Sequence, residues 1–490
     1  MKNQVQLIAY ADRLSGGGLT ELQELLEGPF SGLFGGVHLL PFFSPIDGAD
    51  AGFDPIDHAK VDPRLGSWND IRRLSQRTEI MADLIVNHIS AHSPQFLDFH
   101  ERGEKSPFAG MFLTMGRVFA GGASESDLLR VYRPRPGLSF TKTRLADGTE
   151  HLLWTTFTSE QIDIDVRHPA GKDYLTRILD QFQDAGIRVI RLDAVGYAIK
   201  KPGTSCFMIP ETFEFIAELK AQANARGIEV LVEIHTHYQD QIRIANQADW
   251  VYDFALPPLV LHTLYQRDAC HLKRWLEMSP RNAVTVLDTH DGIGVLDVGP
   301  TRNKEHELPG LLPPERINAL VETIHERSHG ASRQATGAAA ANLDLYQVNC
   351  TFYDALGARD DEYLIARALQ FFAPGVPQVY YCGLLAGSND LDLLRRTGVG
   401  RDINRHYYTP AELNEQLRQP IVRSLFDLIR FRNSHPAFAG EFHLLPCNDQ
   451  SIRIEWRCGG QWARLRVDLQ TMSASVSHSA ADGQRELAIA

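Results

Sequence analysis

Three carboxylates stand where short runs of aliphatic, mostly β-branched residues end. Asp193 follows Val-Ile-Arg-Leu, Glu233 follows Val-Leu-Val, and Asp291 follows Val-Leu-Asp-Thr-His. Cleavage of a glycosidic bond with retention requires a nucleophilic carboxylate and a proton-donating carboxyl group about 5 to 5.5 Å apart, because its transition state resembles an oxocarbenium ion. The pattern therefore indicates nucleophilic and general acid chemistry on a sugar.

A single Asp at the end of a strand has a simpler explanation, because such a residue often caps a helix or pairs with an arginine. Here Arg191 precedes Asp193 by two residues, and alternation along a strand places both side chains on one face. Three carboxylates at three strand ends make a shared catalytic site the better interpretation.

The segment His235-Thr236-His237 offers a metal-dependent alternative. Together with His290 and Asp291 these imidazoles could coordinate zinc, as in metallohydrolases built on barrels. An HxH pair is weak support, since alternation places both imidazoles on one face even when they serve only in hydrogen bonds. We expect no metal and no other cofactor.

Short strands separated by helices must position these groups. Between two strand-like runs, Leu175, Ile178, Leu179 and Phe182 recur at helical spacing, and Gly186 follows as a stop signal. Eight runs in alternation with helices predict an α/β fold, a (β/α)8 TIM barrel, whose active-site groups lie at the carboxyl ends of the strands. The runs are Val5 to Ala11, Gly36 to Phe43, Ile80 to His88, Ile187 to Val195, Ile228 to His235, Trp250 to Ala255, Ala283 to His290 and Val376 to Cys382.

Two connections are far longer than a simple loop in such a barrel, and they follow the third and seventh strands. We predict inserted subdomains there, and short alternating runs after about residue 436 predict a small antiparallel β domain. The predicted catalytic barrel comprises residues 1–86, 167–292 and 358–437. The insertions are 87–166 and a loop or helical subdomain at 293–357, and the C-terminal β domain is 438–490.

The amino-acid composition limits the kinds of molecule that this protein is expected to bind. The 490 residues include 49 Lys and Arg against 61 Asp and Glu, a net charge of −12 that repels nucleic acid and anionic membranes. The six cysteines form no CxxC pair, which favours free thiols in a reducing compartment. The apolar N-terminal stretch is too short for a signal peptide. We therefore expect a cytoplasmic protein with a small-molecule substrate, no nucleic-acid or membrane partner, and a homodimer as an open alternative.

The strand-end residues also resemble a known family. Asp83-Leu-Ile-Val-Asn-His88, Arg191-Leu-Asp193, Glu233 and His290-Asp291 are similar, in this order, to the four signature regions of the α-amylase family of retaining glucosidases and transglucosidases. Further stretches resemble the branch of that family that moves glucose between sucrose and phosphate, and the similarity extends to about residue 440. These stretches are 48–58, 132–137, 193–197, 286–294, 342–349 and 400–408. Gly196-Tyr197 departs from the Lys-His of many amylases, which disfavours a site for long glucans.

The resemblance implies roles for individual residues. Asp193 would be the nucleophile, Glu233 would protonate the departing fructose oxygen, and Asp291 would hold the glucose hydroxyls. The substrates would be sucrose, phosphate, α-glucose 1-phosphate and fructose. The glucose side would comprise Asp50, Phe53, His88, Gln161, Arg191, Tyr197, His290 and Arg401, and the acceptor side Tyr132, Arg135, His235, Asp344, Leu345, Tyr346 and Gln347.

Several alternatives stay open at this point. Arg133 and Arg135 could be solvated loop charges, and Phe53 could be a core residue. The donor could be sucrose 6'-phosphate or a glucosylglycerol, or the acceptor could be water, as in a sucrose hydrolase. A non-catalytic binding subunit is disfavoured, because Asp193 and Glu233 are both present.

Overall fold

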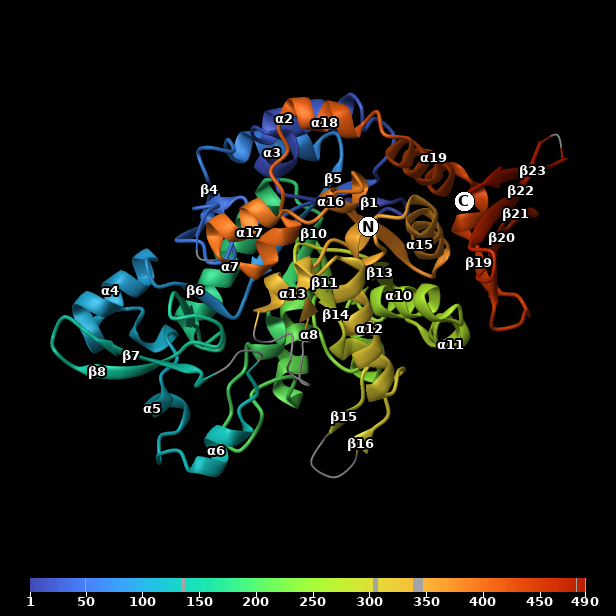
Figure 1. Cartoon of the computed structure of the whole chain (residues 1–490). Helices are drawn as coiled ribbons and strands as arrows, with labels where there is room; N and C mark the ends of the chain where they lie inside the picture. The colour runs from blue at the N-terminus through green and yellow to red at the C-terminus, as the bar shows by residue number, and fades with distance from the viewer. Residues whose placement is uncertain (49, 134–136, 303–306, 338–346, 482, 490) are drawn as a thin grey trace.

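Eight parallel strands close into a barrel at the centre of the molecule. The computed structural model describes residues 1–490 apart from 49, 134–136, 303–306, 338–346, 482 and 490. The strands follow the spatial order β1-β18-β13-β12-β11-β10-β5-β2 (Figure 1). They are β1 Gln6–Ala9, β2 Gly36–Leu39, β5 Glu79–Ile85, β10 Val189–Asp193, β11 Glu229–Val232, β12 Trp250–Asp253, β13 Ala283–Thr285 and β18 Val376–Tyr380.

The predicted (β/α)8 barrel is confirmed, and each predicted run coincides with one of its strands to within a few residues. Every position of β1, β2 and β18 is buried, as expected of parallel strands that are covered on both faces. The largest difference lies in β13, which ends at Thr285 and not at His290. Its neighbour pairs with it only up to Pro377, which has no N–H to extend the ladder, so His290 and Asp291 lie in a loop.

Helices surround the barrel, and α7 illustrates how the sequence builds them. It begins at Pro169, where the side chain of His168 accepts a hydrogen bond from Ala170 N, and it buries the predicted apolar stripe. The helices of this layer are α1 Ala11–Ser15, α2 Leu19–Glu27, α3 Trp68–Ser75, α7 Pro169–Asp184, α8 Pro210–Asn224, α9 Tyr238–Ala245, α10 Leu256–Gln266, α11 Cys270–Met278, α15 Asp360–Phe372, α16 Tyr381–Leu384, α17 Leu391–Thr397, α18 Pro410–Gln416 and α19 Pro420–Ser434.

The connection after β5 forms an insertion with a small core of its own, built on Leu113, Phe119 and Trp154. Its last strand, β9, returns antiparallel to its first, β6, so Gln161 lies opposite Ser90 and near His88. The insertion contains β6 His88–Ser90, α4 Pro94–Arg102, α5 Met115–Val118, α6 Glu125–Arg130, β7 Phe140–Arg144, β8 Glu150–Trp154 and β9 Gln161–Asp163. A short hairpin, β3 Phe43–Ser44 and β4 Asp57–Val61, follows β2.

The connection after β13 is the second insertion. Its strands β14 and β17 pair antiparallel and set Gly294 opposite Gln347. It contains β14 Ile293–Gly294, β15 Thr301–Arg302, β16 Glu307–Leu308, α12 Pro314–Arg327, α13 Ala331–Thr336, β17 Gln347–Val348 and α14 Phe352–Ala355. The domain boundaries predicted from the sequence remain a prediction.

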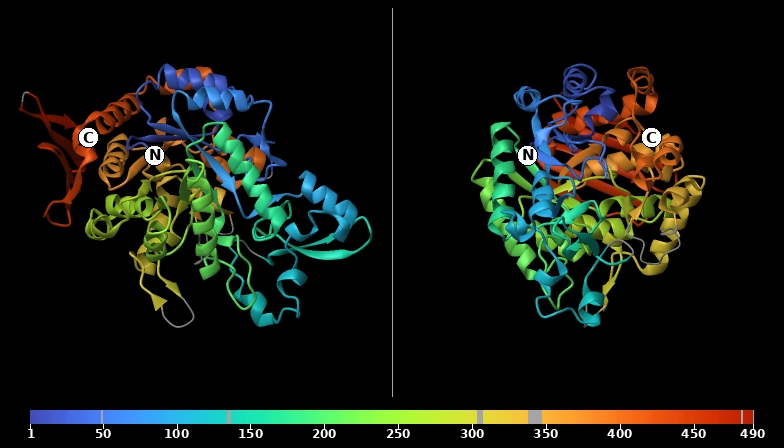
Figure 2. Two further views of the ribbon diagram at one scale, coloured as in Figure 1. Left: turned by 180° about the vertical axis from the view of Figure 1, so that it is seen from behind. Right: turned by 90° about the vertical axis from the view of Figure 1, so that its left-hand side faces the viewer.

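The C-terminal region is the predicted antiparallel sheet, with five strands in sequence order. They are β19 Glu441–Leu444, β20 Ser451–Cys458, β21 Gln461–Asp468, β22 Ser473–Ala480 and β23 Gly483–Ala488. This sheet and the first insertion lie at opposite ends of the molecule (Figure 2). No helix in the described part of the chain combines the length and apolarity that a membrane span needs.

Candidate active site

Asp193 and Glu233 lie side by side because β10 and β11 pair in parallel. Leu192 is opposite Val232, so each carboxylate occupies the position directly after a paired residue. Nη1 of Arg191 is 2.9 Å from Asp193, and its Nη2 is 3.8 Å from Glu233. The side chains of Asp193 and Glu233 are 14% and 11% exposed, so both carboxylates are largely shielded from solvent.

Arg191 is itself held from below by Asp83 of β5. Nη1 of Arg191 is 2.5 Å from Asp83 Oδ1, and Nε2 of His38 is 3.0 Å from Asp83 Oδ2. Burial alone would raise the pKa of Asp83, but His38 and Arg191 lower it to about 2. Asp83 therefore stays charged and holds the guanidinium of Arg191 in place. The other donors of Arg191 point toward the ends of β10 and β11.

Burial raises the pKa of Asp193 above its usual range. Arg191 opposes this effect, while the negative charges of Glu233, Asp83 and Asp291 add to it. Carboxylates that share one buried site cannot all ionise freely, so the protonation of Asp193 depends on its neighbours.

Asp291 has the opposite electrostatic environment. Its carboxylate is 2.9 Å from Nη1 of Arg401 and 3.6 Å from Nη2 of Arg405. Burial would raise the pKa of Asp291, but Arg401, His290 and Arg405 outweigh burial and hold it far below the usual range. Asp291 is therefore a permanent anion, suited to accept hydrogen bonds from sugar hydroxyls.

The remaining residues of the predicted glucose side are gathered around this centre. His88 Nε2 lies 3.0 Å from the carbonyl of Phe53 and 3.1 Å from Nε2 of Gln161. The ring of Phe53 stacks on His290 with 4.7 Å between centroids and an angle of 11°. Asp50 is 3.8 Å from Arg401. Phe53 is only 4% exposed, so it supports the site from beneath and also packs in the core.

Tyr197 belongs to an aromatic cluster that links the first insertion to the barrel. Its ring stacks on Tyr132 at 6.1 Å and meets Phe157 edge-on at 5.2 Å, and Phe207 packs against both tyrosines. This cluster places Tyr132 beside the segment that follows Asp193.

Only some residues of the predicted acceptor side belong to the part of the chain that the structure describes. His235 Nε2 is 3.8 Å from Glu233 and 3.1 Å from Nε2 of Gln347, so these residues meet at the mouth of the barrel. Arg135, Asp344, Leu345 and Tyr346 lie outside the described residues, and their acceptor role remains a prediction.

The structure brings together other possible metal ligands than the pair His235 and His237 that the sequence suggests. Nε2 of His237 is 3.1 Å from the carbonyl of Pro309, so this imidazole does not join His235. Among the described residues, the candidate ligand atoms of Glu233, His235 and Asp291 lie within 4.8 Å of one another. Arg191 and Arg401 adjoin this group, and their positive charges oppose a bound cation.

Arg405 is a site residue that the sequence analysis missed. Its side chain is 1% exposed, and Nε donates to the carbonyl of His290 at 2.8 Å. Nη1 is 3.9 Å from Asp50, so Arg405 joins the loop that carries Asp291 to the loop that carries Asp50. No local pattern marks Arg405, because its partner Asp50 is far away in the sequence. Asp297, which pairs with His235, was missed as well.

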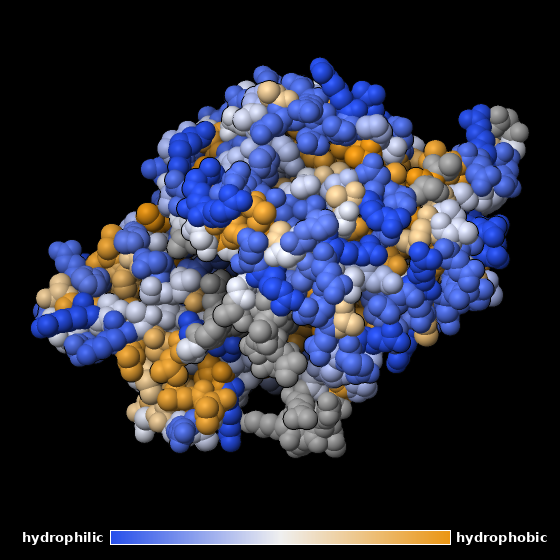
Figure 3. Space-filling view, viewed as in Figure 1, coloured by the Kyte–Doolittle hydropathy of each residue, from blue (hydrophilic) through white to orange (hydrophobic). Residues whose placement is uncertain are grey.

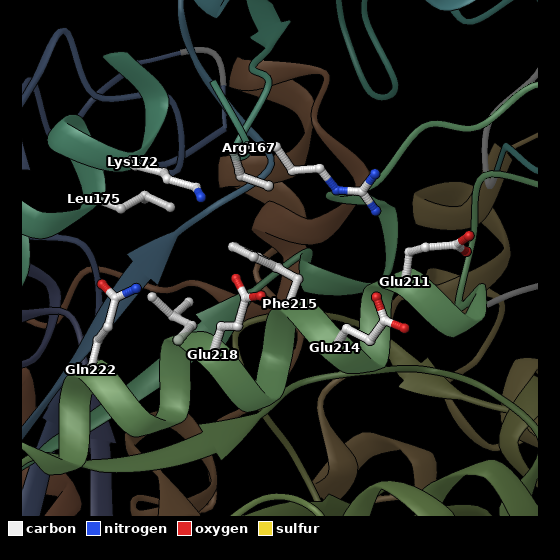
Figure 4. Close-up of a pocket in the computed structure, with 10 residues that line it drawn as sticks. Arg167, Lys172, Leu175, Glu211, Glu214, Phe215, Glu218 and Gln222 are labelled. Carbon is white, nitrogen blue, oxygen red and sulfur yellow. The ribbon is translucent and has the colours of Figure 1, made fainter. Parts of the chain in front are cut away.

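A charged surface groove lies outside the barrel. Between α7 and α8, Arg167 and Lys172 face a row of acidic residues, Glu211, Glu214 and Glu218 (Figure 4). Opposed charges on two helices are typical of a solvated groove, and none of the strand-end carboxylates lines it.

Known proteins similar to this chain come from the family that the strand-end motifs indicate. Residues 33–285 match the family model of the alpha amylase catalytic domain. The chain belongs to the α-amylase family. Within that family it is 61% identical to the sucrose phosphorylase of Agrobacterium vitis, over 98% of each chain. It is 54% identical to the sucrose phosphorylase of Bifidobacterium adolescentis, over 93% of this chain and 90% of that one.

A solved structure of the α-amylase family is also similar along the whole chain. The sucrose 6F-phosphate phosphorylase from Thermoanaerobacter thermosaccharolyticum superposes with a TM-score of 0.91 at 38% identity, over 100% of this chain and 98% of that one. The resemblance inferred from the strand-end motifs is thus confirmed.

Proposed function

We propose that this chain is a sucrose phosphorylase, which transfers glucose reversibly between sucrose and phosphate. The observation that carries the proposal is the 61% identity, along almost the full length of both chains, to a sucrose phosphorylase. The strand-end carboxylates supply the groups that the reaction needs.

The reaction is a double displacement. A carboxylate oxygen of Asp193 attacks the anomeric carbon, the bond to the fructose oxygen breaks, and Glu233 gives that oxygen a proton. Hydrogen phosphate then attacks the anomeric carbon, releases Asp193 and returns a proton to Glu233, so that two inversions yield α-glucose 1-phosphate. Arg191 stabilises the ionised form of Asp193, and Asp291 binds the glucose hydroxyls as the ring distorts.

Phosphate needs little help as a nucleophile, because it is already charged at neutral pH. Water must be deprotonated by Glu233 and held in position. A site that positions phosphate by positive charge therefore favours phosphorolysis over hydrolysis, and we assign this role to the acceptor side, Arg135 included.

The donor is tested by direct comparison. Sucrose, sucrose 6'-phosphate and 2-O-glucosylglycerol are each incubated with the enzyme and phosphate, and the initial rate of α-glucose 1-phosphate formation is measured. We expect sucrose to have the highest kcat/KM. A higher value for either other donor would reassign the enzyme to a related phosphorylase, and unchanged sucrose consumption without phosphate would make it a hydrolase.

Metal dependence is tested in the same assay. The proposed reaction uses only side chains, so activity should survive dialysis against EDTA. The control is the dialysed enzyme after it has been returned to its original buffer. Loss of activity that zinc restores would favour the metal-dependent alternative.

We also propose a cytoplasmic location and a homodimer. All six cysteines are free thiols, which suits a reducing compartment. Apolar side chains gather over the first insertion (Figure 3), where Leu129 is 80% and Leu138 66% exposed. An exposed apolar patch of this kind supports association. Sedimentation velocity should give a dimer that Leu129→Ser weakens, and a monomer at micromolar concentration would contradict the proposal.

A further inference from the structure

Asp297 is a fully buried carboxylate that no step of the reaction above uses. It lies in the short 3-10 helix Leu296–Val298, in the second insertion. Its Oδ2 is 2.9 Å from Nδ1 of His235. Its Oδ1 accepts hydrogen bonds from Thr236 N at 3.1 Å and from Gln241 Nε2 at 3.0 Å. A carboxylate, which only accepts, matches these three donors, and an amide would not.

His235 is held on its other sides as well. Its ring stacks on Phe254 with 3.9 Å between centroids and an angle of 14°. Its Nε2 is 3.8 Å from Glu233 Oε1, and Nε2 of Gln347 donates to the same nitrogen at 3.1 Å in the neutral Nδ1–H form, a contact that protonation of Nε2 replaces. The imidazole therefore has one orientation, with Nδ1 turned to Asp297 and Nε2 turned to the proposed acid/base residue.

Gly294 makes this arrangement possible. A Cβ at position 294 would lie 2.5 Å from Asp297 Oδ2 and 3.0 Å from His235 Nδ1, so any larger residue would push the pair apart. The pairing of Gly294 with Gln347 brings the second insertion against His235 at the same point.

The charges that face His235 come from three loops. Burial alone would lower the pKa of His235, but Asp297, Glu233 and Asp291 together raise it. Phe254, which follows β12, and Gln347 of β17 also pack on the ring and bring no charge. Cations also pair with these carboxylates: Nη2 of Arg191 is 3.8 Å from Oε1 of Glu233, the same oxygen that His235 approaches, and Nη1 of Arg401 is 2.9 Å from Asp291.

We propose that Asp297 is a positioning residue for the phosphate acceptor: it fixes the Nδ1–H form of His235 and stabilises the imidazolium, whose Nε2–H meets phosphate beside Glu233. This inference rests on the proposed function, since it explains how a dianion enters a site that contains three carboxylates. Asp297 touches neither donor nor acceptor and acts through His235.

Kinetics separate this role from a purely structural one. With α-glucosyl fluoride as donor, Asp297→Asn should raise the phosphate KM by about tenfold or more, because the charged partner of phosphate is lost. The KM of the donor and the rate of hydrolysis without phosphate should change little. Asp240→Asn is the matched control, because Asp240 contacts Thr236 Oγ1 at 3.3 Å in the same segment. We expect it to leave the phosphate KM unchanged.

A double variant tests whether Asp297 acts through His235. If it does, Asp297→Asn should add little to the effect of His235→Gln, because the two changes remove one interaction. Additive losses, or equal rises in the KM of phosphate and of the donor, would overturn the proposal.

Nitrogen-15 NMR of the histidine side chains provides a readout that does not depend on activity. In the wild-type enzyme Nδ1 of His235 should carry a proton across the titration, and Asp297→Asn should move the titration of His235 to lower pH. A neutral Nε2–H form in the wild type would overturn the proposal even if the variant does not fold. Should the wild type make no α-glucose 1-phosphate from sucrose, the proposed function and the phosphate role both fail, and the NMR result still decides whether Asp297 fixes the Nδ1–H form of His235.

Discussion

Arg191 carries one positive charge and lies close to three carboxylates, with Asp83 below it and Asp193 and Glu233 at the mouth of the barrel. Because a single cation cannot neutralise three anions, the protonation of Asp193 depends on the charge of Glu233. The two residues of the proposed double displacement are therefore electrostatically linked before any substrate binds.

Loss of the proposed nucleophile should abolish turnover. Asp193→Ala should lower kcat by on the order of 10⁴ or more, because the change removes the whole covalent route. Circular dichroism of the variant serves as the control for folding. Near-native turnover would remove Asp193 from the mechanism.

Glu233→Gln should affect two donors differently. α-Glucosyl fluoride has a good leaving group and needs little proton donation, so its turnover should suffer much less than that of sucrose. Equal impairment with both donors would contradict the assignment of Glu233 as the acid.

The same variant gives a pH prediction for Asp193. The nucleophile must be ionised, so kcat/KM for α-glucosyl fluoride should fall as pH drops and Asp193 takes up a proton. The charge of Glu233 raises the pKa of Asp193, so removing it should move this acid limb to lower pH. A pH profile at constant ionic strength measures the shift, and a shift to higher pH would contradict the described electrostatics.

At the scale of elements, one buried lysine connects the first insertion to the barrel. Lys200, which follows β10, is 2.7 Å from Asp163 of β9 and donates to Asn87 Oδ1 at 2.9 Å, just after β5. Its side chain is 1% exposed and that of Asp163 is fully buried, so the pair is strongly desolvated. Breaking a buried pair by removing one partner costs about 3 to 5 kcal/mol, since the other charge remains unpaired.

Lys200→Met should therefore lower the melting temperature clearly. The adjacent Lys201 is 52% exposed and pairs with Glu211 at the surface, so Lys201→Met is the matched control and should change stability by about 1 kcal/mol or less. Equal melting temperatures for both single variants would show that Lys200 does not stabilise the junction.

Much of this arrangement is readable from the sequence, because it is encoded locally. The aliphatic runs predict the barrel strands, and the carboxylate after each of two runs predicts Asp193 and Glu233. Asp297 and Arg405 are not predictable in this way, since their partners His235 and Asp50 are far away in the sequence and meet them only when loops fold over the barrel. The sequence predicts an end of β13 that lies too far along the chain, because Val286 and Leu287 continue the aliphatic pattern after strand pairing has stopped.

At the scale of the whole molecule, the barrel supplies the proposed chemistry and the two insertions supply the proposed acceptor side. Tyr132 comes from the first insertion, and Gln347 and Asp297 come from the second. Under this proposal, the choice between phosphate and water depends on parts of the chain that are separate from the nucleophile. The C-terminal sheet lies at the far end from the first insertion and contributes no residue to the described site (Figure 2).

Proton NMR of the earliest products, formed from sucrose in saturating phosphate, tests the central claim most directly. The anomeric signal distinguishes α- from β-glucose 1-phosphate, because the phosphate ester fixes the configuration of the anomeric carbon. We expect fructose and α-glucose 1-phosphate in equal amounts, with slow release of free glucose only when phosphate is omitted. The β anomer would contradict the double displacement through Asp193, and glucose as the only glucosyl product would contradict phosphorolysis.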